Sequence, residues 1–192
     1  MFSALLDTSV LWPSLQRDFL LSLGIEGMYR PVWSSAILGE LEYHEAAKLV
    51  ARGAQEAEAA RRARRLIDQM RSAFNDAEVQ GWGGLEGRYG LPDPDDEHVV
   101  AAAVIAGAGA IVTHNVRDFP MARIPTGVQV VRPSDFACNT VAVDPTRALT
   151  AVEAVVRRSG RHGPHLTVDD VLDHLASRYQ MEAAVEMLRL AQ

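Results

Sequence analysis

The sequence predicts an α/β fold, in which a mostly parallel central sheet is sandwiched between layers of helices and is followed by a small helical extension. Short apolar runs alternate with longer helix-forming segments through the first 132 residues, as expected for parallel strands joined by helices. Strand-forming runs are absent from residue 133 onward. A chain of 192 residues suits one domain and an appendage, so we expect a domain over residues 1–132 and a helical extension over residues 133–192.

The elements are expected in alternating order. A first strand ends at Asp7, and a helix follows over residues 13–23. A second strand over residues 29–32 leads into a helix that Ser34 or Ser35 caps. The remaining predicted segments are helices over 55–74 and 96–106, strands over 77–79, 110–113 and 128–131, and extension helices over 145–157, 168–177 and 181–190.

Composition and charge limit the classes of protein to which this chain can belong. Apolar residues make up 48% and charged residues 23%, which is typical of a folded globular chain. The net charge of -6 argues against broad, non-specific nucleic-acid binding, so any such contact must be local. One cysteine, Cys138, cannot form an intramolecular disulfide, and no basic segment precedes an apolar leader. The longest apolar stretch, over residues 99–113, is too short to span a bilayer, so we expect a cytoplasmic protein without a membrane partner.

Polar residues follow the predicted strands at the edge where α/β sheets bind ligands. Asp7 ends the first strand, Asn115 and Asp118 follow the strand over 110–113, and Asp96 begins the helix before it. Glu40 lies one turn inside the helix after the second strand. Carboxylates gathered in one place repel each other unless a cation lies among them, and oxygen ligands favour Mg²⁺ or Mn²⁺. Such a metal site can activate water and stabilise charge on a phosphodiester, so the pattern predicts phosphodiester hydrolysis.

Each of these residues also has a purely structural interpretation. Thr8 and Ser9 either cap the next helix or hold Asp7 in place. The helix dipole favours the carboxylates of Asp93, Asp95 and Asp96 at a helix start whatever their function, and we expect one of the three to be functional. Three histidines are expected at the surface or at helix caps rather than as ligands: His44, His98 and His114.

A basic cluster lies on the predicted helix over residues 55–74. It consists of Arg61, Arg62, Arg64 and Arg65. These side chains either form a solvated helix face or provide the local positive charge that an RNA backbone needs, and we expect Arg61, Arg62 and Arg65 to contact RNA.

Four sequence blocks together resemble the PIN-domain nucleases. They are Leu-Leu-Asp-Thr-Ser-Val-Leu (5–11), Ser-Ala-Ile-Leu-Gly-Glu-Leu (35–41), Pro-Asp-Pro-Asp-Asp-Glu-His-Val-Val-Ala-Ala-Ala (92–103) and Val-Thr-His-Asn-Val-Arg-Asp-Phe-Pro (112–120). The resemblance implies metal ligands at Asp7, Glu40, Asp96, Asn115 and Asp118, with a supporting hydroxyl at Thr113 and a contribution from Asp93. The segment between Asp96 and Asn115 looks one residue longer than in commoner members, which leaves Asp95 as an alternative to Asp96.

The resemblance also implies an activity and partners. Compact bacterial members look like VapC-type toxins, which are dimeric, Mg²⁺-dependent endoribonucleases restrained by a small antitoxin, and the helical extension resembles one found in a subgroup of them. We therefore expect an RNA substrate, a cognate antitoxin and a homodimer. The alternative is a non-catalytic PIN module that binds RNA or a partner protein. A haloacid-dehalogenase enzyme would need an aspartate where Ser9 stands, and a dinucleotide-binding protein would need a glycine-rich turn after the first strand.

Overall fold

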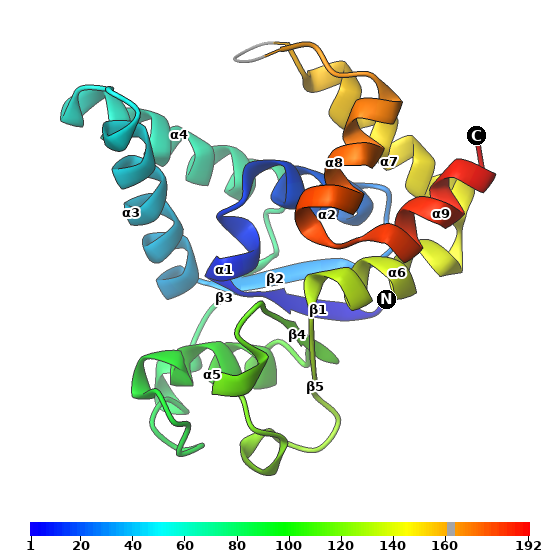
Figure 1. Ribbon diagram of the computed structural model, residues 1–192. Helices are drawn as coiled ribbons and strands as arrows, with labels where there is room; N and C mark the ends of the chain where they lie inside the picture. Colours follow the sequence, from blue (N-terminus) through cyan, green and yellow to red (C-terminus); the bar gives the residue numbers. More distant parts are fainter. Residues whose placement is uncertain (161–163) are drawn as a thin grey trace. The chain divides into compact units, whose positions relative to one another are not determined.

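The computed structural model describes residues 1–160 and 164–192 (Figure 1). Within these residues the strands form a five-stranded sheet in the order β3-β2-β1-β4-β5. The strands are β1 (Ser3–Leu6), β2 (Arg30–Ser34), β3 (Glu78–Val79), β4 (Ala110–Val112) and β5 (Gln129–Val131). β1 pairs with β4 in parallel, as β2 does with β3. The mostly parallel sheet with flanking helices confirms the predicted fold class.

The helices lie close to the expected ranges, with two exceptions described below. They are α1 (Thr8–Leu11), α2 (Ser14–Ile25), α3 (Ser35–Ala51), α4 (Glu56–Ala73), α5 (Glu97–Ile105), α6 (Pro133–Val143), α7 (Pro145–Arg158), α8 (Val168–Tyr179) and α9 (Glu182–Leu190). Among the residues described, no helix combines the length and apolar character needed to cross a membrane.

The two central strands place the first candidate residue. Ala4, Leu5 and Leu6 of β1 are fully buried, and β4 is buried throughout, as expected for strands covered on both faces. Leu6 lies opposite Val112, and the Asp7 N–H donates to the Val112 carbonyl oxygen at 3.1 Å. This bond continues the pairing by one residue, so Asp7 is fixed at the carboxyl end of the sheet.

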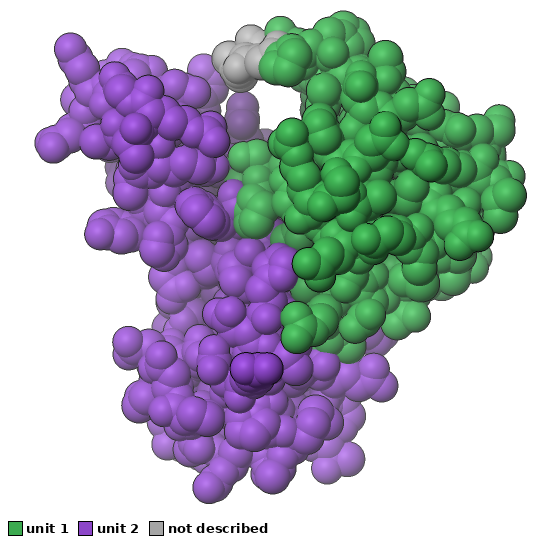
Figure 2. All heavy atoms as spheres, viewed as in Figure 1, with its two compact units in different colours: residues 1, 13–30, 131–192 green, residues 2–12, 31–130 purple. Residues whose placement is uncertain are grey.

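The chain divides into two compact units, coloured separately in Figure 2. The strand unit comprises residues 2–12 and 31–130, and the helical unit comprises residues 1, 13–30 and 131–192. Within the helical unit, α2 packs on α7, and Arg158 donates to the Ser22 hydroxyl at 2.6 Å. Helix α2 therefore shares a core with the C-terminal helices although it comes early in the chain. The expected domain boundary after residue 132 stays a prediction.

Helices α1 and α6 are absent from the sequence-based expectation, which contained three helices after residue 133. The α6 segment is rich in residues of low helix propensity, such as Asn139, Thr140 and Val141. It forms a helix because Phe136, Ala137 and Val141 are buried in the helical unit, and tertiary packing outweighs local propensity. Tyr29 adds an edge-to-face ring contact with Phe136, with centroids 4.8 Å apart.

Helices α3 and α4 lie side by side in the strand unit (Figure 1). The Ser34 hydroxyl caps α3 by accepting the Ile37 N–H at 3.1 Å. α4 buries Ala59, Ala63, Ile67 and Met70, whose spacing of three or four residues places them on one helix face. The arginines of α4 are exposed on its other face.

Candidate active site

A pocket of about 380 Å³ lies in the strand unit around the carboxyl end of β1. It is lined by Asp7, Thr8, Ser9, Trp12, Glu40, His44, Asp96 and Asn115. The structure thus brings together four of the residues expected to bind metal, which come from the end of β1, helix α3, the start of α5 and the loop after β4. Asp93 and Asp118 are not among the residues that line it.

Two hydroxyl groups hold the Asp7 carboxylate. Ser9 Oγ and Thr113 Oγ1 each donate to Asp7 Oδ2 at 2.6 Å. Backbone groups fix both hydroxyls in turn, because the His114 N–H donates to Ser9 Oγ at 3.2 Å and the Asn115 N–H donates to Thr113 Oγ1 at 3.0 Å. The loop after β4 therefore sets the orientation of a carboxylate at the end of β1.

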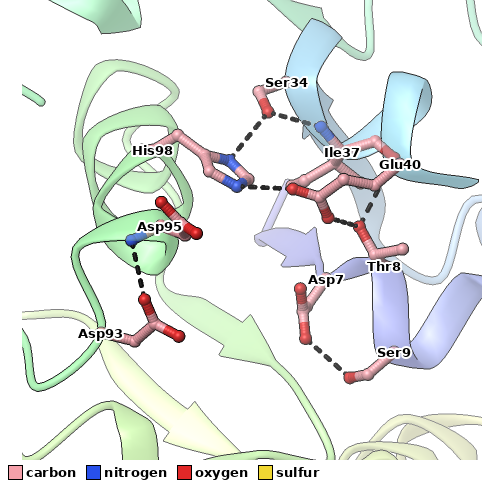
Figure 3. Close-up of polar contacts among 9 residues, drawn as sticks. All are labelled: Asp7, Thr8, Ser9, Ser34, Ile37, Glu40, Asp93, Asp95 and His98. Atoms are coloured by element: carbon pink, nitrogen blue, oxygen red, sulfur yellow. Dashed lines mark hydrogen bonds and ion pairs between the residues drawn. The ribbon is translucent and has the colours of Figure 1, made fainter.

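Of the two roles that the sequence left open for Thr8 and Ser9, Ser9 takes the one of holding Asp7, and neither hydroxyl caps α1. Ser9 supports Asp7, whereas Thr8 Oγ1 donates to Glu40 Oε2 at 2.5 Å (Figure 3). The short helix α1 turns these adjacent hydroxyls toward different carboxylates. Asp7 itself is buried, with 6% of its surface exposed.

His98 is buried and bonded to Glu40, so the expectation of a surface or cap residue is wrong for this histidine. Its Nε2 lies 3.0 Å from Glu40 Oε1, and its Nδ1 lies 3.4 Å from Ser34 Oγ (Figure 3). Burial opposes ionisation of Glu40, but the hydrogen bonds from His98 and Thr8 outweigh it and hold the pKa of Glu40 below its ordinary value. Burial likewise acts to lower the pKa of His98, but Glu40 outweighs it and raises that pKa. His44 and His114 are exposed, as expected.

Negative charge accumulates at the start of α5. Burial raises the pKa of Asp96 to about 6, with further contributions from the charges of Asp7, Asp93 and Asp118. Asp93 accepts the Asp95 N–H at 2.9 Å and so caps the short turn that carries Asp96 (Figure 3). Asp95 is exposed, and of the three aspartates only Asp96 lines the pocket.

The side chains of the pocket offer mainly oxygen donors to a cation. Across residues 1–160 and 164–192, no three carboxylate, histidine or cysteine side chains lie close enough together to hold one ion. Glu40 is engaged by Thr8 and His98, which leaves the carboxylates of Asp7 and Asp96 with the amide of Asn115. Mg²⁺ is commonly held by one or two carboxylates while it keeps several waters. Oxygen donors and accumulated negative charge are therefore the chemistry that suits a hydrated divalent cation.

Comparison with known proteins identifies the fold. A family model described as PIN domain matches residues 3–117, which is more than half of the chain and includes every residue of the pocket. The chain belongs to the PIN-domain family. Members of this family are generally nucleases, so the fold is a nuclease fold. No curated protein and no solved structure matches the chain.

Three pocket or pocket-supporting residues were missed in the sequence: Trp12, His44 and His98. The signal for His98 was its position two residues after Asp96, in the first turn of α5. The arginines expected to bind RNA lie on α4 and do not line the pocket. Arg61 pairs with Glu58 and Arg64 with Glu42, whereas Arg62 and Arg65 have no acidic partner within the described chain.

Proposed function

We propose that this chain is a metal-dependent endoribonuclease and that the pocket around Asp7 is its active site. The observation that carries the proposal is the Asp7 carboxylate, which two hydroxyls orient at the carboxyl end of β1 in the same pocket as Asp96. A buried carboxylate fixed in this way is suited to act as a metal ligand, because its orientation is set before the metal ion binds.

In this proposal Asp7 and Asp96 hold Mg²⁺, with Mn²⁺ as a substitute, and Asn115 adds an amide oxygen. When bound, the ion supplies Lewis-acid activation of water and of the phosphodiester.

Glu40 is ionised and oriented by Thr8 and His98, so it can reach the ion through a water or accept a proton from the attacking water. Asp118 adds negative charge near Asp96. The products are a 3′-hydroxyl and a 5′-phosphate, as the family resemblance implies.

The biological role we propose is that of the toxin in a VapC-type pair, restrained by a small antitoxin and acting as a homodimer. The four motif blocks support this role, together with the helical segment after residue 133. Induced expression in a bacterial host should arrest growth, and the Asp7→Asn variant should not. Normal growth with well-expressed wild-type chain would contradict the toxin role.

The activity is tested by incubating purified protein with total RNA in Mg²⁺, in Mn²⁺ and in EDTA. We expect cuts at a few discrete sites that EDTA and Asp7→Asn abolish. Glu86→Gln is the matched control, because it removes an exposed carboxylate that does not line the pocket. Equal cleavage by wild type and Asp7→Asn would overturn the assignment of the site. A folded protein that cuts no RNA with either metal would favour the non-catalytic binding module.

A further inference from the structure

Aromatic side chains form one side of the pocket. Trp12 and His44 line it with the carboxylates, and Tyr43 adjoins His44. The Trp12 and His44 ring centroids are 6.3 Å apart with a 60° tilt, and those of Tyr43 and His44 are 5.4 Å apart at 72°. We call Trp12, Tyr43 and His44 the aromatic shelf. All three belong to the strand unit.

The shelf is exposed to solvent, unlike the tryptophan of strand β2. Trp12 is 43% exposed and Tyr43 is 72% exposed, whereas Trp33 is fully buried. The Lys48 ammonium lies 5.8 Å from the centroid of the Trp12 ring and forms an ion pair with Glu45, so its charge is partly neutralised. A large exposed aromatic surface of this kind contributes little to the core and is available to a ligand.

Helix α1 fixes Trp12 relative to Asp7. The helix begins directly after Asp7, and Val10 and Leu11 in it are fully buried. Trp12 is the C-cap of the helix, and its backbone N–H donates to the Thr8 carbonyl oxygen at 2.9 Å. A single buried helical turn therefore connects the candidate metal ligand to the indole, so any group held by Trp12 is positioned with respect to Asp7.

We propose that the aromatic shelf is a stacking site for an unpaired RNA base next to the phosphate that is cleaved, with Trp12 as the platform. This inference rests on the proposed ribonuclease function and identifies the part of the RNA substrate, an unpaired base, that the pocket binds. Phosphates are repelled by the acidic lining in the absence of metal, but stacking on an aromatic ring does not depend on charge. The base must be unpaired, because a base stacked within a duplex has no free face.

Stacking of this kind tolerates all four bases, since every base has a π face. The shelf therefore selects single-stranded or looped RNA rather than a sequence.

The test uses a short single-stranded RNA that the protein cuts, with each nucleotide in turn made abasic. For wild type, an abasic nucleotide at one position next to the cut should lower kcat/KM by about 5- to 150-fold, the range equivalent to losing one stacked base. Trp12→Leu should lower kcat/KM on the intact RNA by a similar factor and should be insensitive to the abasic nucleotide at that position. Trp12→Phe, which keeps a π face, should restore most of the loss. Met121→Ala removes an exposed apolar side chain outside the pocket and should change nothing.

A binding measurement separates this inference from the proposed activity. RNA affinity is measured in EDTA by fluorescence anisotropy with the Asp7→Asn protein, with and without Trp12→Leu, and melting temperatures check that each variant is folded. If wild type cuts RNA but Trp12→Leu cuts and binds equally well, the shelf is wrong and the nuclease stands. If wild type cuts nothing but Trp12→Leu weakens binding by the expected factor, the shelf stands and the nuclease is wrong. If wild type cuts nothing and Trp12→Leu leaves RNA affinity unchanged, both the shelf and the nuclease are wrong.

Discussion

Hydrogen-bond donors of different kinds hold two carboxylates of the pocket, Asp7 and Glu40. Asp7 is held by two hydroxyls that the β4 loop fixes through its backbone N–H groups. Glu40 is held by Thr8 and by the buried His98, whose other nitrogen faces Ser34. Ser34 also caps α3, so one hydroxyl links the start of the helix that carries Glu40 to the histidine that orients it. Single substitutions in this network should therefore lower catalysis by changing the orientation of the Asp7 or Glu40 carboxylate.

Replacement of His98 by alanine should lower kcat/KM for RNA cleavage by about 10- to 100-fold, the usual cost of losing a residue that orients a ligand. Glu40 would lose its bond from Nε2, and its side chain is partly exposed, so it would reorient. His98→Gln, which can still donate to Glu40, should recover part of the activity. Steady-state kinetics on a defined RNA provide the measurement, and far-UV circular dichroism excludes unfolding. Equal activity in His98→Ala and wild type would show that Glu40 needs no such support.

The conformation of the loop before α5 depends on one buried carboxylate, that of Glu97. Glu97 is 3% exposed and accepts the Tyr89 N–H at 3.0 Å and the Leu91 N–H at 2.9 Å. These bonds hold the glycine-rich segment against the start of the helix that positions Asp96. Burial opposes ionisation, but the backbone donors outweigh it and lower the pKa of Glu97.

We expect Glu97→Gln to destabilise the protein by about 1–3 kcal/mol, because the amide cannot accept both N–H groups as well as a charged carboxylate does. Urea unfolding at neutral pH measures this change. Glu86→Gln, in the same loop but exposed, is the control and should leave the free energy of unfolding unchanged. A stability equal to wild type in Glu97→Gln would mean that the loop is held by other contacts.

Helix α4 carries the proposed contacts to the RNA backbone, and its ion pairs indicate which arginines matter. Arg61 and Arg64 are paired with glutamates on α4 and α3, so their charge is partly neutralised. Arg62 and Arg65 are exposed and therefore should carry most of the phosphate contact. Replacing both by glutamate should weaken RNA binding and reduce the slope of log K against log salt by about 1.4, if each arginine contacts one phosphate of a single strand.

The control for this charge reversal is Arg147→Glu combined with Arg157→Glu on α7, which changes the net charge by the same amount. Affinity at several salt concentrations, measured in EDTA, distinguishes a local contact from a general charge effect. If both double variants weaken RNA binding equally, α4 has no special role.

Much of this architecture follows from local pattern, and the exceptions have physical reasons. The buried runs of β1 and β4 and the periodic apolar face of α4 are encoded over a few residues, so their ranges were predictable. Asp7 and Asn115 could be selected because strand ends collect ligands, whereas Glu40 and Asp96 lie on or at helices and could be selected from their positions in the motif blocks. Helix α6 and the burial of His98 depend on packing between distant segments, which residue spacing does not reveal. Trp12 is a single aromatic residue whose neighbours become apparent only after folding.

At the scale of the whole molecule, the site is a local concentration of negative charge in a chain whose net charge is already -6. The charges of Asp7, Asp93 and Asp118 all disfavour ionised Asp96. Folding therefore brings together carboxylates that repel each other, and this repulsion opposes the folded state. The proposed metal should act on stability as well as on catalysis, and stability can be measured without any substrate.

We expect Mg²⁺ or Mn²⁺ to raise the melting temperature of wild type, because a ligand that binds only the folded state stabilises it by about 2.7 kcal/mol at a hundred times its Kd. For a chain of this size that corresponds to roughly 5–10 °C. In EDTA, Asp96→Asn should melt at or above the wild-type temperature, because one repelling charge is gone. Addition of the metal ion should raise the melting temperature of this variant only slightly. Differential scanning calorimetry at constant ionic strength measures both, and Glu86→Gln should follow wild type. A metal-induced shift as large in Asp96→Asn as in wild type would place the cation elsewhere, and an unshifted wild type would remove the metal from the proposal.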